Sequence, residues 1–114
     1  MSGIVGTSHS KSKVIGRSQD TAKVWVRSNN SADMLSTFGV SSLADTGTGV
    51  ITVTFLTAFP NNNYVGLVMT QDKSGNFMHF CRMAQQTTTT CTIENYQNNA
   101  AADGGNYHFA IFGE

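Results

Sequence analysis

Hydrophobic and polar residues alternate with a period of two in several short segments of the chain. The clearest is residues 50–56, where Ile51, Val53 and Phe55 fall on one face and threonines on the other. Alternation of this kind, rich in β-branched residues, is typical of a strand with one buried face. The Gly- and Thr-rich residues 45–49 are typical of a turn. This stretch predicts sheet scaffold, and we expect function to reside elsewhere on the surface.

The same alternation recurs along the chain, and no stretch of ten residues has the period of a helix. In residues 22–27 it places Val24 and Val26 on the face opposite Trp25. The other strand-like segments are residues 36–42, 64–71, 76–84, 88–95 and 107–113, the last with Tyr107, Phe109 and Ile111 on one face. About seven to eight short strands separated by turns predict an all-β fold, a compact antiparallel β-sandwich with an extended N-terminal arm.

Residues 76–84 and 88–95 flank a polar turn, which predicts a β-hairpin. A turn centred on Gln86 gives these expected pairs: Cys81 with Cys91, His79 with Ile93 and Met83 with Thr89. Opposed cysteines permit a disulfide, but such bridges are often strained, so two small buried hydrophobic residues are the favoured interpretation. His79 and Cys81 share a face that is expected to be buried, which favours a hydrogen-bonded core histidine over a Cys–His nucleophile.

Residues 64–71 are apolar on both faces, which is typical of a central strand or of a strand that contacts another subunit. On the next strand, Met78 and Phe80 lie on the face opposite His79. The core of one monomer covers only one face of each strand, and large exposed apolar patches usually mark interfaces. We therefore expect a homo-oligomer, specifically a homotrimer.

Residues 1–20 differ in composition from the rest and show no sustained period, so we divide the chain into an N-terminal arm, 1–20, and a β-sandwich domain, 21–114. The arm combines two apolar pairs with basic residues. Two interpretations remain open: a frayed terminus, or an arm that docks on a partner chain. In the second, the docking residues are Ile4, Val5, Lys11, Lys13, Val14, Ile15 and Arg17.

Composition narrows the class of protein. The 114 residues fit one domain, with 39% hydrophobic residues to build a core. Only 12% of the residues are charged and the formal net charge is zero, which argues against nucleic acid as a partner. No apolar run approaches the length of a membrane span and the first residues lack the apolar core of a signal peptide, so we expect neither membrane insertion nor Sec export.

Residues suited to catalysis or metal binding are sparse. The three histidines, His9, His79 and His108, have no metal-ligand spacing, and the two cysteines lack further ligands nearby. The acids are scattered over turns and chain ends, so a paired-carboxylate site would require the fold to bring two of them together. We therefore expect no enzyme activity, no metal and no cofactor.

Two loop regions combine aromatic and amide side chains. These groups suit carbohydrate, because sugars present CH faces to aromatic rings and hydroxyls to amides. The alternative is that the asparagines simply form turns. The candidate receptor-contact residues are Asn61, Asn62, Asn63 and Tyr64 in one region and Tyr96, Gln97, Asn98 and Asn99 in the other.

Residues 11–68 carry a longer motif. After the tryptophan strand "AKVWVR" come "TFGVSSLADTGTGVITVTF" and the turn "PNNNY". This order resembles the C-terminal receptor-binding (knob) module of tailed-bacteriophage tail-fibre proteins. In that family a V-S-S-hydrophobic-x-D-x-G-T-G segment precedes a Thr-containing strand and a Pro-x-x-x-Tyr turn. Gly39 departs from the pattern, since the family commonly has Asn before V-S-S, and beyond Ala84 the resemblance fades.

The resemblance implies a trimeric β-sandwich at the exposed tip of a virion fibre, where loops contact the host surface, often its glycan. Host polysaccharide is then one partner, and other virion proteins are partners through the arm. The chain starts with Met about twenty residues before the domain, so a complete chain would be a small stand-alone virion protein. A capsid decoration (cement) or head-fibre protein, anchored by its arm, is then the alternative.

Overall fold

The computed structural model describes residues 21–71 and 78–113, and most of these residues lie in β-strands. The nine strands are β1 (Ala22–Asn29), β2 (Met34–Phe38), β3 (Val40–Gly47), β4 (Val50–Phe55), β5 (Val65–Thr70), β6 (His79–Ala84), β7 (Thr90–Gln97), β8 (Ala100–Ala101) and β9 (Asn106–Phe112). The described residues contain no helix. The predicted arm, residues 1–20, lies outside them.

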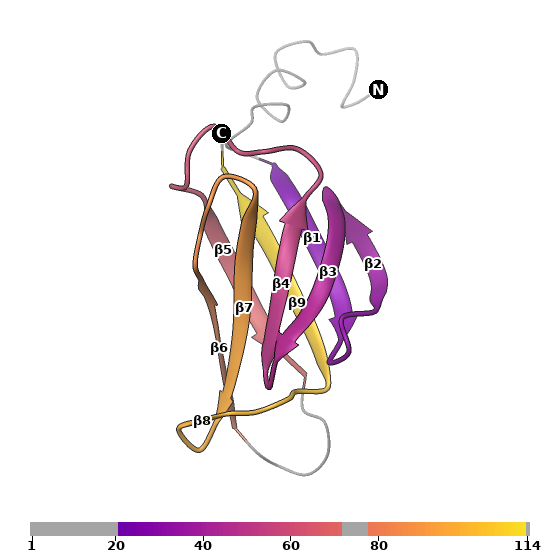
Figure 1. The fold of residues 1–114 in the computed structure, drawn as a ribbon, viewed down its shortest axis with the longest axis vertical. Helices are drawn as coiled ribbons and strands as arrows, with labels where there is room; N and C mark the ends of the chain where they lie inside the picture. The colour runs from indigo at the N-terminus through magenta and orange to yellow at the C-terminus, as the bar shows by residue number, and fades with distance from the viewer. Residues whose placement is uncertain (1–20, 72–77, 114) are drawn as a thin grey trace, which may run out of the picture.

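The strands form two antiparallel sheets that lie face to face (Figure 1). Sheet A has the strand order β2-β1-β9-β5. Sheet B has the order β3-β4-β7-β6, and the short strand β8 pairs with β7. This arrangement confirms the predicted antiparallel β-sandwich, with one short strand more than expected.

The long strands run along the body, which measures 50 × 29 × 22 Å, so their connections gather at two ends (Figure 1). The arm end holds Thr21, the β2–β3 connection at Gly39, residues 56–64 and residues 85–89. The distal end holds the turns that follow β1, β3 and β7. We call the first of these the arm end because residues 1–20 are attached there, at Thr21.

The inward faces of the two sheets form one hydrophobic core. Ile51 and Val53 of β4, Ile93 of β7, and Tyr107 and Ile111 of β9 are at most 1% exposed. Each hydrophobic side chain contributes about 1.5–3 kcal/mol when it is fully removed from water. The predicted inward faces of β1, β4 and β9 are confirmed, because alternation fixes which side chains share a face.

The strand β5 lies at the edge of sheet A, beside β9, so the expectation of a central strand is wrong. Its inward residue Val68 packs against the core, while Val65, Leu67 and Met69 point outward and remain exposed. The alternative interpretation, contact with another subunit, stays a prediction.

The predicted pairing of β6 with β7 is wrong by four residues, although the hairpin itself is confirmed. Cys81 lies opposite Asn95 instead of Cys91. The remaining expected pairs change likewise, since His79 pairs with Gln97 and Met83 with Ile93. The hydroxyl of Thr87 accepts hydrogen bonds from the backbone N–H groups of residues 89 and 90, which closes a separate turn and lengthens the connection.

The predicted long loop after β7 is partly ordered as a second, short hairpin. Tyr96 and Gln97 belong to β7 and pair with Ala101 and Ala100 of β8. The two residues between them, Asn98 and Asn99, have φ angles of 52° and 65°. Two consecutive positive φ angles are the geometry of a type I′ turn, which asparagine tolerates better than most residues.

Replacing Ile93 with alanine is expected to lower the free energy of unfolding by about 2–5 kcal/mol, because truncating a fully buried side chain leaves a cavity. Urea unfolding followed by circular dichroism measures the loss. Ser42→Ala, at an exposed position of β3, is the control and should change stability by less than about 0.5 kcal/mol. Equal losses in the two variants would contradict the placement of Ile93 in the core.

Candidate functional site

The two predicted receptor-contact regions lie at opposite ends of the sandwich (Figure 1). Residues 61–63 are exposed at the arm end, whereas residues 96–99 lie at the distal end. Three strands, β5 to β7, separate the two regions, and an odd number of antiparallel crossings places two loops at opposite ends. They therefore cannot form one site within a protomer.

Tyr64 is not a surface residue, so its prediction as a receptor contact is wrong. Its ring is 4% exposed and packs on the rings of Phe55 and Phe59. Its hydroxyl donates to the carbonyl oxygens of Thr87 and Thr90, at 2.7 and 3.0 Å. Burial raises its pKa to about 12. Tyr64 is a structural residue that joins the 56–64 segment to the start of β7.

Asn61 also has a structural role in its loop, because its side-chain oxygen accepts from the N–H of Asn63 at 2.9 Å. This local hydrogen bond agrees with the alternative interpretation of the asparagines, in which they form turns. The carbonyl of Asn62 accepts from the side chain of Gln86 at 3.3 Å, so this position contributes its backbone. Asn62 and Asn63 are both exposed.

Tyr96 belongs to a polar network on the outer face of sheet B. Arg82 donates from Nε and Nη2 to Oε1 of Glu94 at 2.9 and 2.8 Å, and the Tyr96 hydroxyl donates to the same oxygen at 3.1 Å. The guanidinium carbon lies 5.4 Å from the centre of the Tyr96 ring. The hydrogen bonds from Arg82 lower the pKa of Glu94. The network holds an aromatic ring and an exposed guanidinium beside the distal hairpin.

The outer face of sheet A has an apolar central row, and Arg27 and His108 lie in the next row. Trp25, Ala110 and Leu67 lie in one row across β1, β9 and β5, and Phe38 extends the row by stacking on Trp25 with centroids 6.2 Å apart. Trp25 is 42% exposed and Leu67 65%. The small side chain of Ala110 leaves a trough of about 520 Å³ between its two larger neighbours. Met69 borders the same trough.

The outer face of sheet B is divided: hydroxyl groups dominate it over β3, β4 and β7, whereas Phe80 of β6 is 66% exposed on the same face. Thr52 pairs with Thr92, and Thr54 pairs with both Ser42 and Thr90. These side chains hydrogen-bond readily to water, so the threonine-rich part of this face suits solvent, whereas the apolar row on the outer face of sheet A suits a partner. The sequence indicated that β5 is apolar on both faces. The trough, however, forms only where strand pairing places residues of β1, β9 and β5 side by side.

His79 and Cys81 have separate hydrogen-bond partners. His79 Nδ1 lies 2.9 Å from Nδ2 of the buried Asn95, and Thr70 donates to the Cys81 sulfur at 2.9 Å. Burial raises the pKa of Cys81, which disfavours the thiolate that a nucleophile requires. These contacts agree with the predicted hydrogen-bonded histidine. Cys81 and Cys91 are both free thiols.

Asp45 and Asp103 border one polar hollow at the distal end. Asp103 accepts from the N–H of Gly49 at 2.8 Å, which gives it a structural role in that turn. Within residues 21–71 and 78–113, no three His, Cys, Asp or Glu side chains are grouped as metal ligands. A search of the same residues finds no helix with the length and hydropathy to span a membrane.

The predicted docking residues of the arm all precede Thr21 and lie outside the described residues. Comparisons with protein-family models, with curated proteins and with solved structures find no match.

Thiol reactivity tests the placement of the cysteines. Cys91 is fully buried, and burial raises its pKa to about 12, so near neutral pH it should not react with Ellman's reagent in the folded protein. Urea should expose it and restore full reaction. Cys81→Ser isolates this signal, and complete reaction of that folded variant would contradict the buried position.

Proposed function

We propose that the chain is a bacteriophage virion structural protein, a small tail-fibre or receptor-binding module that contacts the host cell surface. The observation that carries the proposal is the row of exposed apolar side chains on the outer face of sheet A, formed by Phe38, Trp25 and Leu67. An exposed apolar sheet face is unfavourable in water and usually marks an interface. The resemblance of residues 11–68 to a fibre-tip module supplies the biological setting.

The assembly that we propose is a homotrimer in which sheet A faces the neighbouring copies. The trough over Ala110 lies beside the projecting Leu67 and Met69, so the same face offers both a recess and a ridge. A recess and a ridge on one subunit allow successive copies to interlock around a closed ring. The threonines on the outer face of sheet B then face solvent.

The receptor surface that we propose is the distal hairpin, residues 96–99. It lies at the end opposite Thr21, and hence away from the attachment of the arm (Figure 1). Tyr96 offers an aromatic face, and Asn98 and Asn99 are exposed amides on a tight turn. Host polysaccharide is the proposed ligand class, bound weakly by one copy and more strongly by three.

The second candidate is a capsid decoration or head-fibre protein exposed on the particle surface. The composition of residues 1–20 favours it, because apolar pairs and basic residues suit docking on another virion protein. In this case the distal hairpin still faces outward, but the essential contact is the one made by the arm.

The oligomeric state is the first test. Light scattering of the purified full chain should give three times the monomer mass. Leu67→Glu should reduce the mass to that of a monomer, because it places a charge in the apolar interface without changing the core. Ser42→Glu, an exposed position on the other outer face, should leave the trimer intact. A monomeric wild-type protein at micromolar concentration would refute the proposed assembly.

Binding to cells is the second test. Fluorescently labelled trimer should bind to host cells and compete with phage adsorption. The double variant Tyr96→Ala, Gln97→Ala should bind to cells about tenfold more weakly, which corresponds to a loss of about 1.4 kcal/mol in binding free energy. Asn62→Ala, at the arm end, is the matched control. Labelling of purified capsids but not of cells would favour the decoration protein instead.

A further inference from the structure

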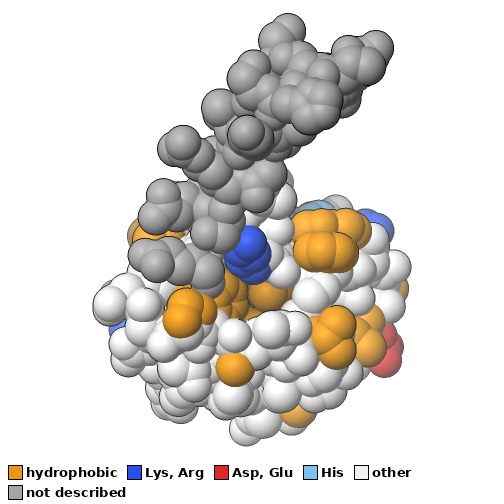
Figure 2. All heavy atoms as spheres, turned by 90° about the horizontal axis from the view of Figure 1, so that it is seen from above, with side chains coloured by type: hydrophobic (Ala, Val, Ile, Leu, Met, Phe, Trp, Pro, Cys, Tyr) orange, Lys and Arg blue, Asp and Glu red, His pale blue; other side chains and the backbone are white. Residues whose placement is uncertain are grey.

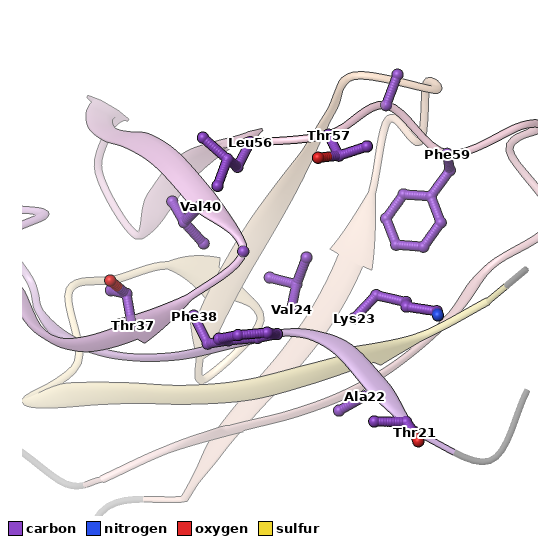
Figure 3. A pocket seen from close by; sticks show the side chains of 12 residues that line it. Thr21, Ala22, Lys23, Val24, Thr37, Phe38, Val40, Leu56, Thr57 and Phe59 are labelled. Carbon is purple, nitrogen blue, oxygen red and sulfur yellow. The ribbon is translucent and has the colours of Figure 1, made fainter. Parts of the chain in front are cut away.

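A large cavity opens at the arm end of the sandwich, between the start of β1 and the 56–59 segment. It has a volume of about 660 Å³. Figure 3 shows Val24, Val40 and Phe59 projecting toward it from three separate segments. Leu56 borders it and is 69% exposed. Viewed from this end, hydrophobic side chains surround and line a hollow (Figure 2).

Among the described residues, the first residues of β1 pair with one strand only, and the cavity lies beside them. Ala22 and Val24 pair with β9, but pairing with β2 begins at Trp25. At Gly39, whose φ is 76°, the chain leaves sheet A and crosses to sheet B. On this side of β1 the backbone of Gly39 lies against the carbonyl of Lys23, so among the described residues the cavity is bordered by the crossing chain and not by a further strand.

We propose that this cavity binds the apolar pair Val14–Ile15 of a neighbouring copy of the chain, an inference that rests on the proposed trimer. Both residues are β-branched and favour an extended strand. One can face the apolar lining while the other faces outward, since successive strand residues point to opposite sides.

The length of the chain fits this exchange between copies. Thr21 itself lines the cavity, and Ile15 precedes it by six residues, a span of at most about 20 Å. In a cyclic trimer all copies point the same way, so three arm ends and three cavities lie together. The body is 29 × 22 Å across, so neighbouring ends are separated by a distance comparable with this span.

Charge distinguishes the interior of the site from its rim. Among the described residues that line the cavity, Lys23 is the one charged side chain and none is acidic. Lys13 and Arg17, which flank the pair, are therefore expected to project into solvent. The other apolar pair, Ile4–Val5, is separated from Thr21 by a longer segment, which lowers its effective concentration at the cavity. It remains available to another virion protein.

A cysteine crosslink tests the inference in the full chain. In a Cys81→Ser background, Val14→Cys combined with Leu56→Cys should give covalent dimers and trimers on a non-reducing gel after mild oxidation. Val14→Cys combined with Ser42→Cys, which lies outside the cavity, is the control and should give few. A purely intramolecular product, or no crosslink, would overturn the exchange.

Light scattering of the same samples separates the two proposals. A trimer without the intermolecular crosslink contradicts only this inference, whereas a monomer contradicts the proposed assembly as well. A second variant requires no crosslink: Ile15→Asp should lower the melting temperature of the trimer by about 4 °C or more, and Ile4→Asp should not. Equal effects of these two substitutions would also overturn the inference.

Discussion

Each strand of the sandwich has two faces and the core covers only one, and this constraint decides both the fold and its surface. Where hydrophobic residues occupy alternate positions, as at Ile51 and Val53, the strand buries them and presents threonines to solvent. The strand β5 is apolar at every position from Leu67 to Met69, so burying Val68 leaves its two neighbours outside. The apolar outer face of sheet A follows from the packing of this strand beside β9 and β1.

The antiparallel order adds a polarity along the long axis. The long strands cross the body, so the arm end and the distal end are built from different connections. The arm end is open, with a cavity beside the first residues of β1. The distal end is closed by tight turns, including the Asn98–Asn99 hairpin. A body with one open, apolar end and one closed, polar end is suited to attachment at the first and contact at the second.

A buried polar junction fixes the distal end. Asn95 of β7 is fully buried, donates from its backbone to the carbonyl of Gly49 at 2.8 Å and from its side chain to the carbonyl of Ala102 at 2.7 Å. Gly49 has a φ of 70°, and a Cβ there would lie 2.5 Å from the Ala102 oxygen, so glycine is required. The Gly- and Thr-rich turn thus serves as scaffold, because it anchors the loop behind the distal hairpin.

The sequence by itself determined the inward faces of β1, β4 and β9, including Tyr107 and Ile111, because side-chain alternation is a local property. Counting strands between the two amide-rich loops also places them at opposite ends. Only the tertiary structure decided the register of β6 with β7, since the hydroxyl of Thr87 closes a turn of its own. It alone decided that Tyr64 is buried and that Trp25 lies in a row with Ala110. Such contacts depend on strands that are distant in sequence, and no local pattern specifies which strands become neighbours.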